Sequence, residues 1–139
     1  MLLLLCLFYT PAIAQKNEID KSLEGKTFQI VFYEYSKDAG QKGVPIHDEI
    51  TFINGKLYSK YMGKEYGFPS CNYAIEKNQL RNGKTVISFV SAGNNENNGQ
   101  ILYWEGKIAD DTIEGIMNWF SKPMVKTFTG TLKYSGEER

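Results

Sequence analysis

The sequence predicts an all-β fold, an eight-stranded antiparallel up-and-down β-barrel in one domain. Aromatic residues make up 14% of its 139 residues, a share that suits a small strand-rich domain. Short runs of Val, Ile, Thr, Phe and Tyr alternate with Gly, Asn and Asp turn signals. Helical character is limited to one short segment, residues 17–23. The predicted strands are residues 26–35, 47–54, 56–62, 71–77, 84–92, 100–108, 112–121 and 125–134.

The first fourteen residues are almost wholly apolar and end in Ala12-Ile13-Ala14, the small-x-small pattern that precedes a signal-peptidase cut. The run is too short to span a bilayer as a helix. We therefore expect an exported protein, periplasmic or secreted, with no membrane span in its mature form. A lipid anchor on Cys6 is the alternative, but the residue before Cys6 is not small. The expected divisions are a signal peptide (1–14), an amino-terminal segment (15–25), the barrel (26–134) and a disordered tail (135–139).

Charge and residue counts exclude several classes of function. Lys+Arg and Asp+Glu both number 16, so the chain lacks the basic excess that nucleic acid requires. Cys71 is the one cysteine left after removal of the signal peptide, so an internal disulfide is not expected. His47 is the single histidine, which excludes a histidine-rich metal site. We expect neither a metal nor a cofactor.

The connections between predicted strands alternate in length. Asn54-Gly55, Asn82-Gly83 and Asp110-Asp111 close short hairpins, because Asn, Asp and Gly tolerate the positive φ of tight turns. The connections between them are longer and cover residues 36–46, 63–70 and 93–99. Since alternate connections of a meander lie at the same end, the pattern predicts a cup with a tight floor and a loop-lined mouth.

Alternation along the strands predicts which side chains face the interior. If Asp110 and Asp111 form a turn, Ile108 pairs with Ile113 and Gly106 lies opposite Gly115. A facing glycine pair permits strong curvature or makes room for a neighbouring ring. Residues 84–92 are apolar on both faces, so their facing is not assigned. The predicted inward set is Phe28, Ile30, Phe32, Ile50, Phe52, Leu57, Tyr61, Tyr73, Ile75, Trp104, Ile108, Ile113, Met117, Trp119, Phe128, Gly130 and Leu132.

Extending the inward alternation toward the mouth gives a candidate ligand pocket with an apolar base and a few polar groups near its entrance. Its aromatic members could stack on a flat ligand or donate a hydrogen bond to it. The alternative is that Glu34 and Asp48 are solvated rim residues. The candidate ligand-binding residues are Phe32, Glu34, Asp48, Tyr61, Cys71, Tyr73 and Trp119.

Catalytic signals are weak, and we expect that the protein is not an enzyme. A Ser-His-Asp triad or an activated Cys71 would need His47 close by. An acid/base role of Glu34 or Asp48 is the remaining catalytic alternative. The stretch Asn94–Asn98 has a single charged residue, so we interpret it as a flexible polar loop and not as a calcium site.

The chain resembles a group of exported bacterial proteins with a lipocalin-like, calycin-type barrel. The most specific feature is the pattern W-x-G-x-I-x-D-D-x-I-x-G from Trp104 to Gly115. In such proteins this pattern looks like a hairpin signature. The resemblance implies a lipocalin-like or avidin-like barrel, and most of the group has no characterised function. Supporting segments are residues 47–60, 66–76 and 126–133.

Two functions follow from these expectations. The first is binding of a small apolar or amphipathic ligand at the long-loop end of the barrel. The second is a structural or protein-interaction module whose barrel is filled by its own side chains, with a protein partner or a second copy on its outer face. Its basis is a set of apolar residues with outward parity: Val31, Tyr33, Ile101, Tyr103, Ile116 and Phe120.

Overall fold

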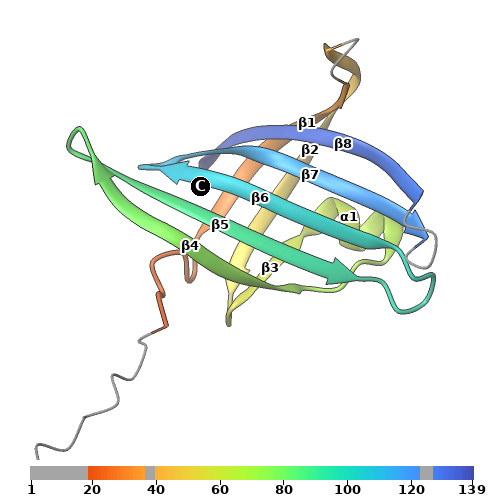
Figure 1. The fold of residues 1–139 in the computed structure, drawn as a ribbon, viewed down its shortest axis with the longest axis horizontal. Helices are drawn as coiled ribbons and strands as arrows, with labels where there is room; N and C mark the ends of the chain where they lie inside the picture. Colours follow the sequence, from red (N-terminus) through yellow and green to blue (C-terminus); the bar gives the residue numbers. More distant parts are fainter. Residues whose placement is uncertain (1–18, 37–39, 123–126) are drawn as a thin grey trace, which may run out of the picture.

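The computed structural model describes residues 19–36, 40–122 and 127–139. Eight antiparallel strands form a closed barrel in sequence order, and the last strand pairs with the first (Figure 1). This is the predicted fold class, a calycin-like up-and-down barrel. One short helix, α1 (Lys60–Tyr66), lies between β3 and β4. The strands are β1 (Thr27–Ser36), β2 (Gly40–Ile53), β3 (Lys56–Ser59), β4 (Cys71–Arg81), β5 (Lys84–Asn94), β6 (Ile101–Ala109), β7 (Thr112–Lys122) and β8 (Thr127–Glu138).

The three predicted tight turns are present and lie at one end of the barrel, which we call the floor. Asn54, Asn82 and Asp110 all have positive φ, at 53°, 50° and 54°. These values fall in the left-handed region that Asn and Asp tolerate better than most residues. Ala109 pairs with Thr112 across the Asp110–Asp111 turn, as the alternation predicted. The paired aspartates are therefore a hairpin turn.

The predicted inward face is confirmed wherever the structure describes its strand residues. Trp104, Ile108, Ile113 and Met117 are buried, as are the inward residues predicted on β1, β2 and β3. The unassigned strand β5 is settled as well, since Ile87, Phe89 and Ser91 are its buried side. The side chains of Phe128 and Leu132 lie outside the described part of the chain, as does the expected signal peptide.

Gly106 pairs with Gly115, and together they make room for a ring. The Tyr134 side chain fills the space beneath them, and its hydroxyl donates a hydrogen bond to the Glu105 carbonyl at 2.8 Å. A Cβ added at Gly115 would lie 2.7 Å from Tyr134 Cζ and would overlap the Glu105 carbonyl. The Trp104 ring packs edge-on against Tyr134, so the glycine pair supports the core of the barrel wall.

Several predicted element boundaries were wrong. The predicted strand 71–77 continues as β4 to Arg81. The predicted strand 56–62 ends at Ser59, and α1 begins at the next residue. The predicted long loop 36–46 is mostly strand, because β2 begins at Gly40. The expected disordered tail instead continues β8 as far as Glu138, whose backbone N–H donates to the Asp111 carbonyl at 2.6 Å.

The amino-terminal segment closes the floor. Leu23 has no exposed surface, and Gly25 N–H donates to the Phe52 carbonyl at 2.7 Å. The Glu24 carboxylate accepts hydrogen bonds from the backbone N–H groups of Asn54 and Gly55 in the β2–β3 turn. The sequence predicted this segment only as a possible helical turn. In the structure it is a plug that covers the floor, and both backbone and side-chain hydrogen bonds attach it to the β2–β3 hairpin.

Candidate functional site

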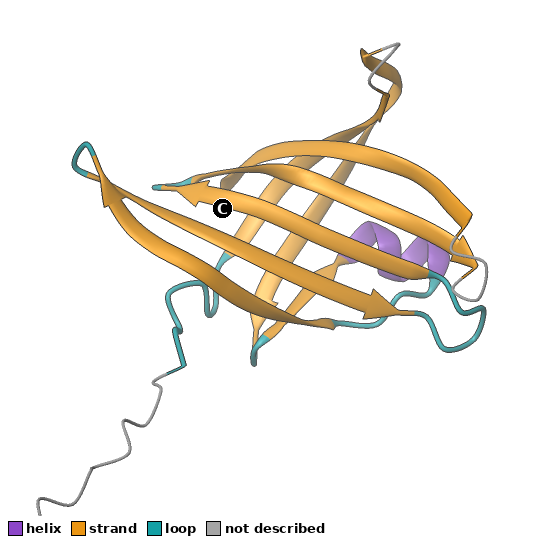
Figure 2. Cartoon of the chain, in the orientation of Figure 1, coloured by secondary structure: helices purple, strands orange, loops and turns teal. Residues whose placement is uncertain are grey.

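Helix α1 lies at the end of the barrel opposite the turns, which we call the helix end (Figure 2). Ser59 is its N-cap, with extended backbone, and its hydroxyl accepts a hydrogen bond from Met62 N–H at 3.1 Å. Gly67 ends the helix in the left-handed conformation, with φ 74°, and its N–H donates to the Gly63 carbonyl at 3.0 Å. Only Met62 of the helix is fully buried.

Asp48 of β2 holds the first turn of α1. Its side chain is only 6% exposed and accepts from the Ser59 hydroxyl at 2.5 Å and from Tyr61 N–H at 2.7 Å. It also accepts from Glu49 N–H at 2.7 Å. Burial raises the pKa of the Asp48 carboxyl, and these three hydrogen bonds oppose that shift without cancelling it. The predicted rim carboxylate is therefore buried and is a structural support of the helix.

Asn95, in the loop between β5 and β6, holds the last turn of α1. It is 3% exposed, and its side-chain amide donates to the Tyr66 carbonyl at 2.8 Å. Its amide oxygen accepts from Asn97 N–H at 3.2 Å, and its backbone N–H donates to the Gln100 carbonyl at 2.8 Å. The residue lies in the stretch that we expected to be a flexible polar loop, yet its side chain is buried and hydrogen-bonded through both its amide nitrogen and its amide oxygen.

Five aromatic rings meet at the helix end, and we call them the aromatic cluster: Phe32, Tyr61, Tyr66, Phe68 and Trp119. Ring centroids are 5.7 Å apart for Phe32 and Tyr61 and 6.0 Å apart for Tyr61 and Tyr66. Trp119 contacts Tyr66 at 4.6 Å and Phe68 at 6.2 Å, both edge to face. Tyr66 remains 40% exposed. The cluster is thus a continuous chain of rings that runs from the barrel core to the surface.

Trp119 carries an unused donor in this cluster. Its indole Nε1 is buried and has no hydrogen-bond partner within the part of the chain that the structure describes. A buried N–H without an acceptor carries an unfavourable free energy. A ligand that supplied an acceptor atom to this N–H would remove that penalty and bind more tightly. An acceptor atom on a flat molecule that stacks in the cluster could meet this donor.

The structure brings together four of the seven predicted site residues. Phe32, Tyr61 and Trp119 belong to the aromatic cluster, and Asp48 bonds to the backbone of Tyr61. The other three are Glu34, Cys71 and Tyr73.

Those three lie outside the cluster. Glu34 is exposed on β1, beyond an irregularity in the β1–β2 pairing. Cys71 is a buried thiol that donates to the Pro69 carbonyl at 3.3 Å, and burial raises its pKa, which favours the unreactive protonated form. Tyr73 is directed to the floor, where its ring contacts Phe52 and its hydroxyl donates to Glu24.

Sequence reasoning missed Tyr66, Phe68 and Asn95. A local signal was present for the helix, because Ser59 and Gly67 bracket it as an N-cap and a left-handed C-terminal glycine. Recognising α1 would have placed Tyr61 and Tyr66 on a helix. Nothing local distinguishes Asn95 from its neighbours in Asn94–Asn98, since its burial depends on contact with a helix nearly thirty residues earlier.

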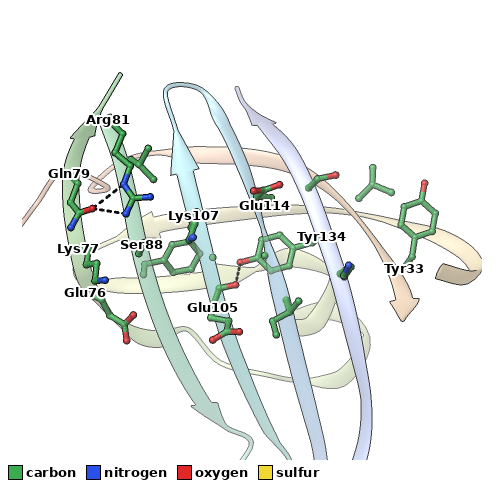
Figure 3. A pocket seen from close by; sticks show the side chains of 18 residues that line it. Tyr33, Glu76, Lys77, Gln79, Arg81, Ser88, Glu105, Lys107, Glu114 and Tyr134 are labelled. Carbon is green, nitrogen blue, oxygen red and sulfur yellow. Dashed lines mark hydrogen bonds between the residues drawn. The ribbon is translucent and has the colours of Figure 1, made fainter. Parts of the chain in front are cut away.

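The described residues form a groove and a crevice outside the barrel interior. A groove of about 720 Å³, here called the outer groove, crosses the outer face of the wall from β4 to β1 (Figure 3). Val31, Tyr33 and Ile116 give it an apolar part, and Lys107 and Glu114 lie opposite each other within it. The crevice of about 560 Å³ lies between the amino-terminal segment and the start of β4. The interior itself is occupied by a contiguous apolar core.

Within the described ranges, His, Cys, Asp and Glu side chains do not gather in any group of three that could hold a metal ion. None of the helices described has the length and apolar character needed to cross a membrane.

Comparison with models of known protein families, with curated proteins and with solved structures gave no match.

Proposed function

We propose that the protein binds a small, flat, amphipathic molecule in the aromatic cluster at the helix end of the barrel. The ligand ring would take the position of Tyr66 against Trp119, and an acceptor atom of the ligand would meet Trp119 Nε1. The observation that carries this proposal is Trp119 Nε1, for which the described residues supply no acceptor, inside a chain of rings that reaches the surface. We further propose that the protein acts after export, on the basis of its apolar first fourteen residues, and that it is a lipocalin-like protein, on the basis of the pattern Trp104–Gly115.

The position of Tyr66 supports this placement. Its ring makes the closest centroid contact with Trp119 and is the most exposed member of the cluster. A half-exposed ring loses less apolar contact on moving than the buried rings of Phe32 or Phe68 would lose. The apolar core inside the barrel is compatible with such a ligand, because binding would exchange one ring for another and would not need a preformed hollow.

Dansylamide is a suitable probe, because it joins a planar ring system to a sulfonamide acceptor. We expect its fluorescence to increase on binding and to be excited by energy transfer from tryptophan. Trp119→Phe keeps a ring but removes the donor, so it should weaken binding about tenfold, the value of roughly one hydrogen bond. Trp119→Ala removes ring and donor together and should weaken binding further.

Tyr103→Ala is the matched control. Tyr103 lies on the outer side of β6 and is 38% exposed, close to the exposure of Tyr66, but it is outside the aromatic cluster. Its removal should leave dansylamide binding unchanged. Equal affinity in the wild type, both Trp119 variants and the control would contradict the proposed site.

A protein-interaction module is the second candidate function. The observation that favours it is the outer groove, where apolar and charged residues of both signs lie on the outer face of the barrel. If this function is correct, a paired change of Val31 and Ile116 to Ser should abolish an association of the protein that sedimentation analysis detects in the wild type. A monomer at millimolar concentration that captures no partner through this face would count against it.

A further inference from the structure

Helix α1 contacts the barrel through few apolar side chains. Besides Met62, the rings of Tyr61 and Tyr66 pack edge-on against rings of the barrel wall. Met62 is its one fully buried side chain, and the remaining residues of the helix are partly or fully exposed. Within the described residues, the backbone hydrogen bonds of α1 and Gly67 are internal to the helix and its cap, and none joins a strand. A segment with so little buried apolar surface and no sheet pairing opens at a lower free energy than the barrel strands around it.

Buried polar side chains supply the missing attachment. Four polar side chains are buried in the described part of the chain, namely Asp48, Ser59, Ser91 and Asn95. Three of them serve α1: Asp48 and Ser59 at its first turn, and Asn95 at its last. Burial of such groups is unfavourable unless they are hydrogen-bonded, so their placement at the two ends of one short helix fixes that helix in a single position.

The two attachments would not hinder opening strongly. When the helix moves away, water reaches Asp48 and Asn95 and replaces the lost partners, so each bond resists opening only by its net value, which is smaller than the cost of leaving these groups unpaired in a buried site. Gly67 can act as a pivot, because glycine adopts negative φ about as readily as the positive value of 74° that it has here. Movement of α1 would carry Tyr61 and Tyr66 away from Phe32 and Trp119 and uncover the aromatic cluster.

We infer that α1 is a displaceable lid, latched at its first turn by Asp48 and at its last by Asn95, whose opening limits how fast a ligand reaches Trp119. The inference rests on the proposed function for its ligand, but the movement of the helix can be measured without one.

Asn95→Asp isolates the second latch. The variant keeps the oxygen that accepts from Asn97 N–H, but it replaces the donor to Tyr66 with a second oxygen that faces the Tyr66 carbonyl. Asn98→Asp is the matched control, because it makes the same change of charge in the same loop, where the Asn98 amide donates to Gln100 and not to α1. Gly67→Ala loosens the same end of the helix independently, since a non-glycine residue is strained at this φ.

Amide hydrogen exchange of residues 60–66 measures lid opening in the protein without ligand. We expect exchange there to become about tenfold faster in Asn95→Asp and in Gly67→Ala, while β6 and β7 exchange as in the wild type. Asn98→Asp should match the wild type. Helix amides that exchange only as slowly as the strands, in the wild type and in both lid variants, would overturn the lid.

Stopped-flow association of dansylamide tests the control of access. We expect the association rate of Asn95→Asp to rise by about the same factor as its exchange. Faster exchange with an unchanged association rate would overturn the gating role, because the ligand would then reach Trp119 without the lid. If dansylamide fails to bind even the wild type, the proposed function is lost, and the exchange result alone decides whether α1 is a lid.

Discussion

At the floor of the barrel, three two-residue turns and the amino-terminal plug close the structure through backbone conformation and backbone hydrogen bonds. At the helix end, a seven-residue helix and five rings do so through side chains that come from distant parts of the chain. Each end has a carboxylate that accepts hydrogen bonds from two backbone N–H groups. Glu24 at the floor accepts both from the β2–β3 turn. Asp48 at the helix end accepts one from α1 and one from the next residue of its own strand. The exposed carboxylate supports a turn that forms locally, whereas the buried one holds a helix that has little other support. From this difference we expect the floor to be the fixed end and the helix end to be the adaptable one.

Cavity-forming substitutions give the largest expected contrast between the ends. Ile108 lies beside the Asp110–Asp111 turn and is 1% exposed, so Ile108→Ala should lower the free energy of unfolding by about 3 kcal/mol. Met62 is equally buried, but Met62→Ala should cost only about 1 to 2 kcal/mol, because α1 can shift to fill the space. Denaturant unfolding measures both values. A cost at Met62 equal to that at Ile108 would indicate that α1 is as fixed as the wall.

Removal of the two carboxylates should give a smaller contrast in the same direction. Asp48→Ala leaves Tyr61 N–H, Glu49 N–H and the Ser59 hydroxyl without their acceptor in a buried site, so we expect a loss of about 2 kcal/mol. Glu24→Ala frees groups that water can reach, so its effect on thermal unfolding should be clearly smaller. A greater loss on removing Glu24 would reverse the proposed ranking of the two ends.

The pH dependence of Asp48 sharpens this comparison. Burial raises its pKa above the ordinary value of 3.8, so the folded protein binds a proton there more readily than the unfolded chain does. The resulting contribution to the free energy of unfolding is present in full below 3.8 and is lost as pH rises through the raised pKa. Asp48→Asn does not titrate, so the free energy of unfolding of the wild type minus that of the variant should fall over this window. A difference that stays constant from about pH 3 to about pH 7 would contradict the raised pKa.

The smallest effect is expected at the floor turn. Asp110→Asn keeps a residue that tolerates the φ of 54° and loses only a surface ion pair with Lys84, whose charged atoms are 3.9 Å apart. The free energy of unfolding should therefore change by less than about 0.5 kcal/mol, and dansylamide binding should not change. A large loss of binding in this variant would show that the paired aspartates act beyond their turn.

Sequence reasoning succeeded where structure is decided locally. The turns at Asn54, Asn82 and Asp110 follow from residues that tolerate positive φ, and strand alternation then assigns Trp104, Ile108 and their partners to the interior. The glycine pair was predicted to make room for a ring, but the ring could not be identified as Tyr134. That identification requires the register between β7 and β8, which alternation within one hairpin does not specify.

The helix end was predicted less well, because it depends on contacts across the barrel. Alternation correctly directed Phe32 and Trp119 inward at this end, and it identified Asp48 as a residue of interest. Strand alternation treated Tyr61 as a strand residue and overlooked Tyr66. A helix of seven residues is too short to show a recognisable periodic pattern of apolar residues. Asn95 could not have been chosen from its neighbours, because its partner is the carbonyl of Tyr66.

Titration of isotopically labelled protein with dansylamide, followed through the chemical shifts of its backbone amides, shows whether the helix end is where this barrel receives a ligand. We expect changes concentrated in α1 and around Trp119 and Asn95, with little change in the β2–β3 and β6–β7 turns. Changes confined to the floor turns, or to Val31 and Ile116 in the outer groove, would exclude a ligand site at the helix end.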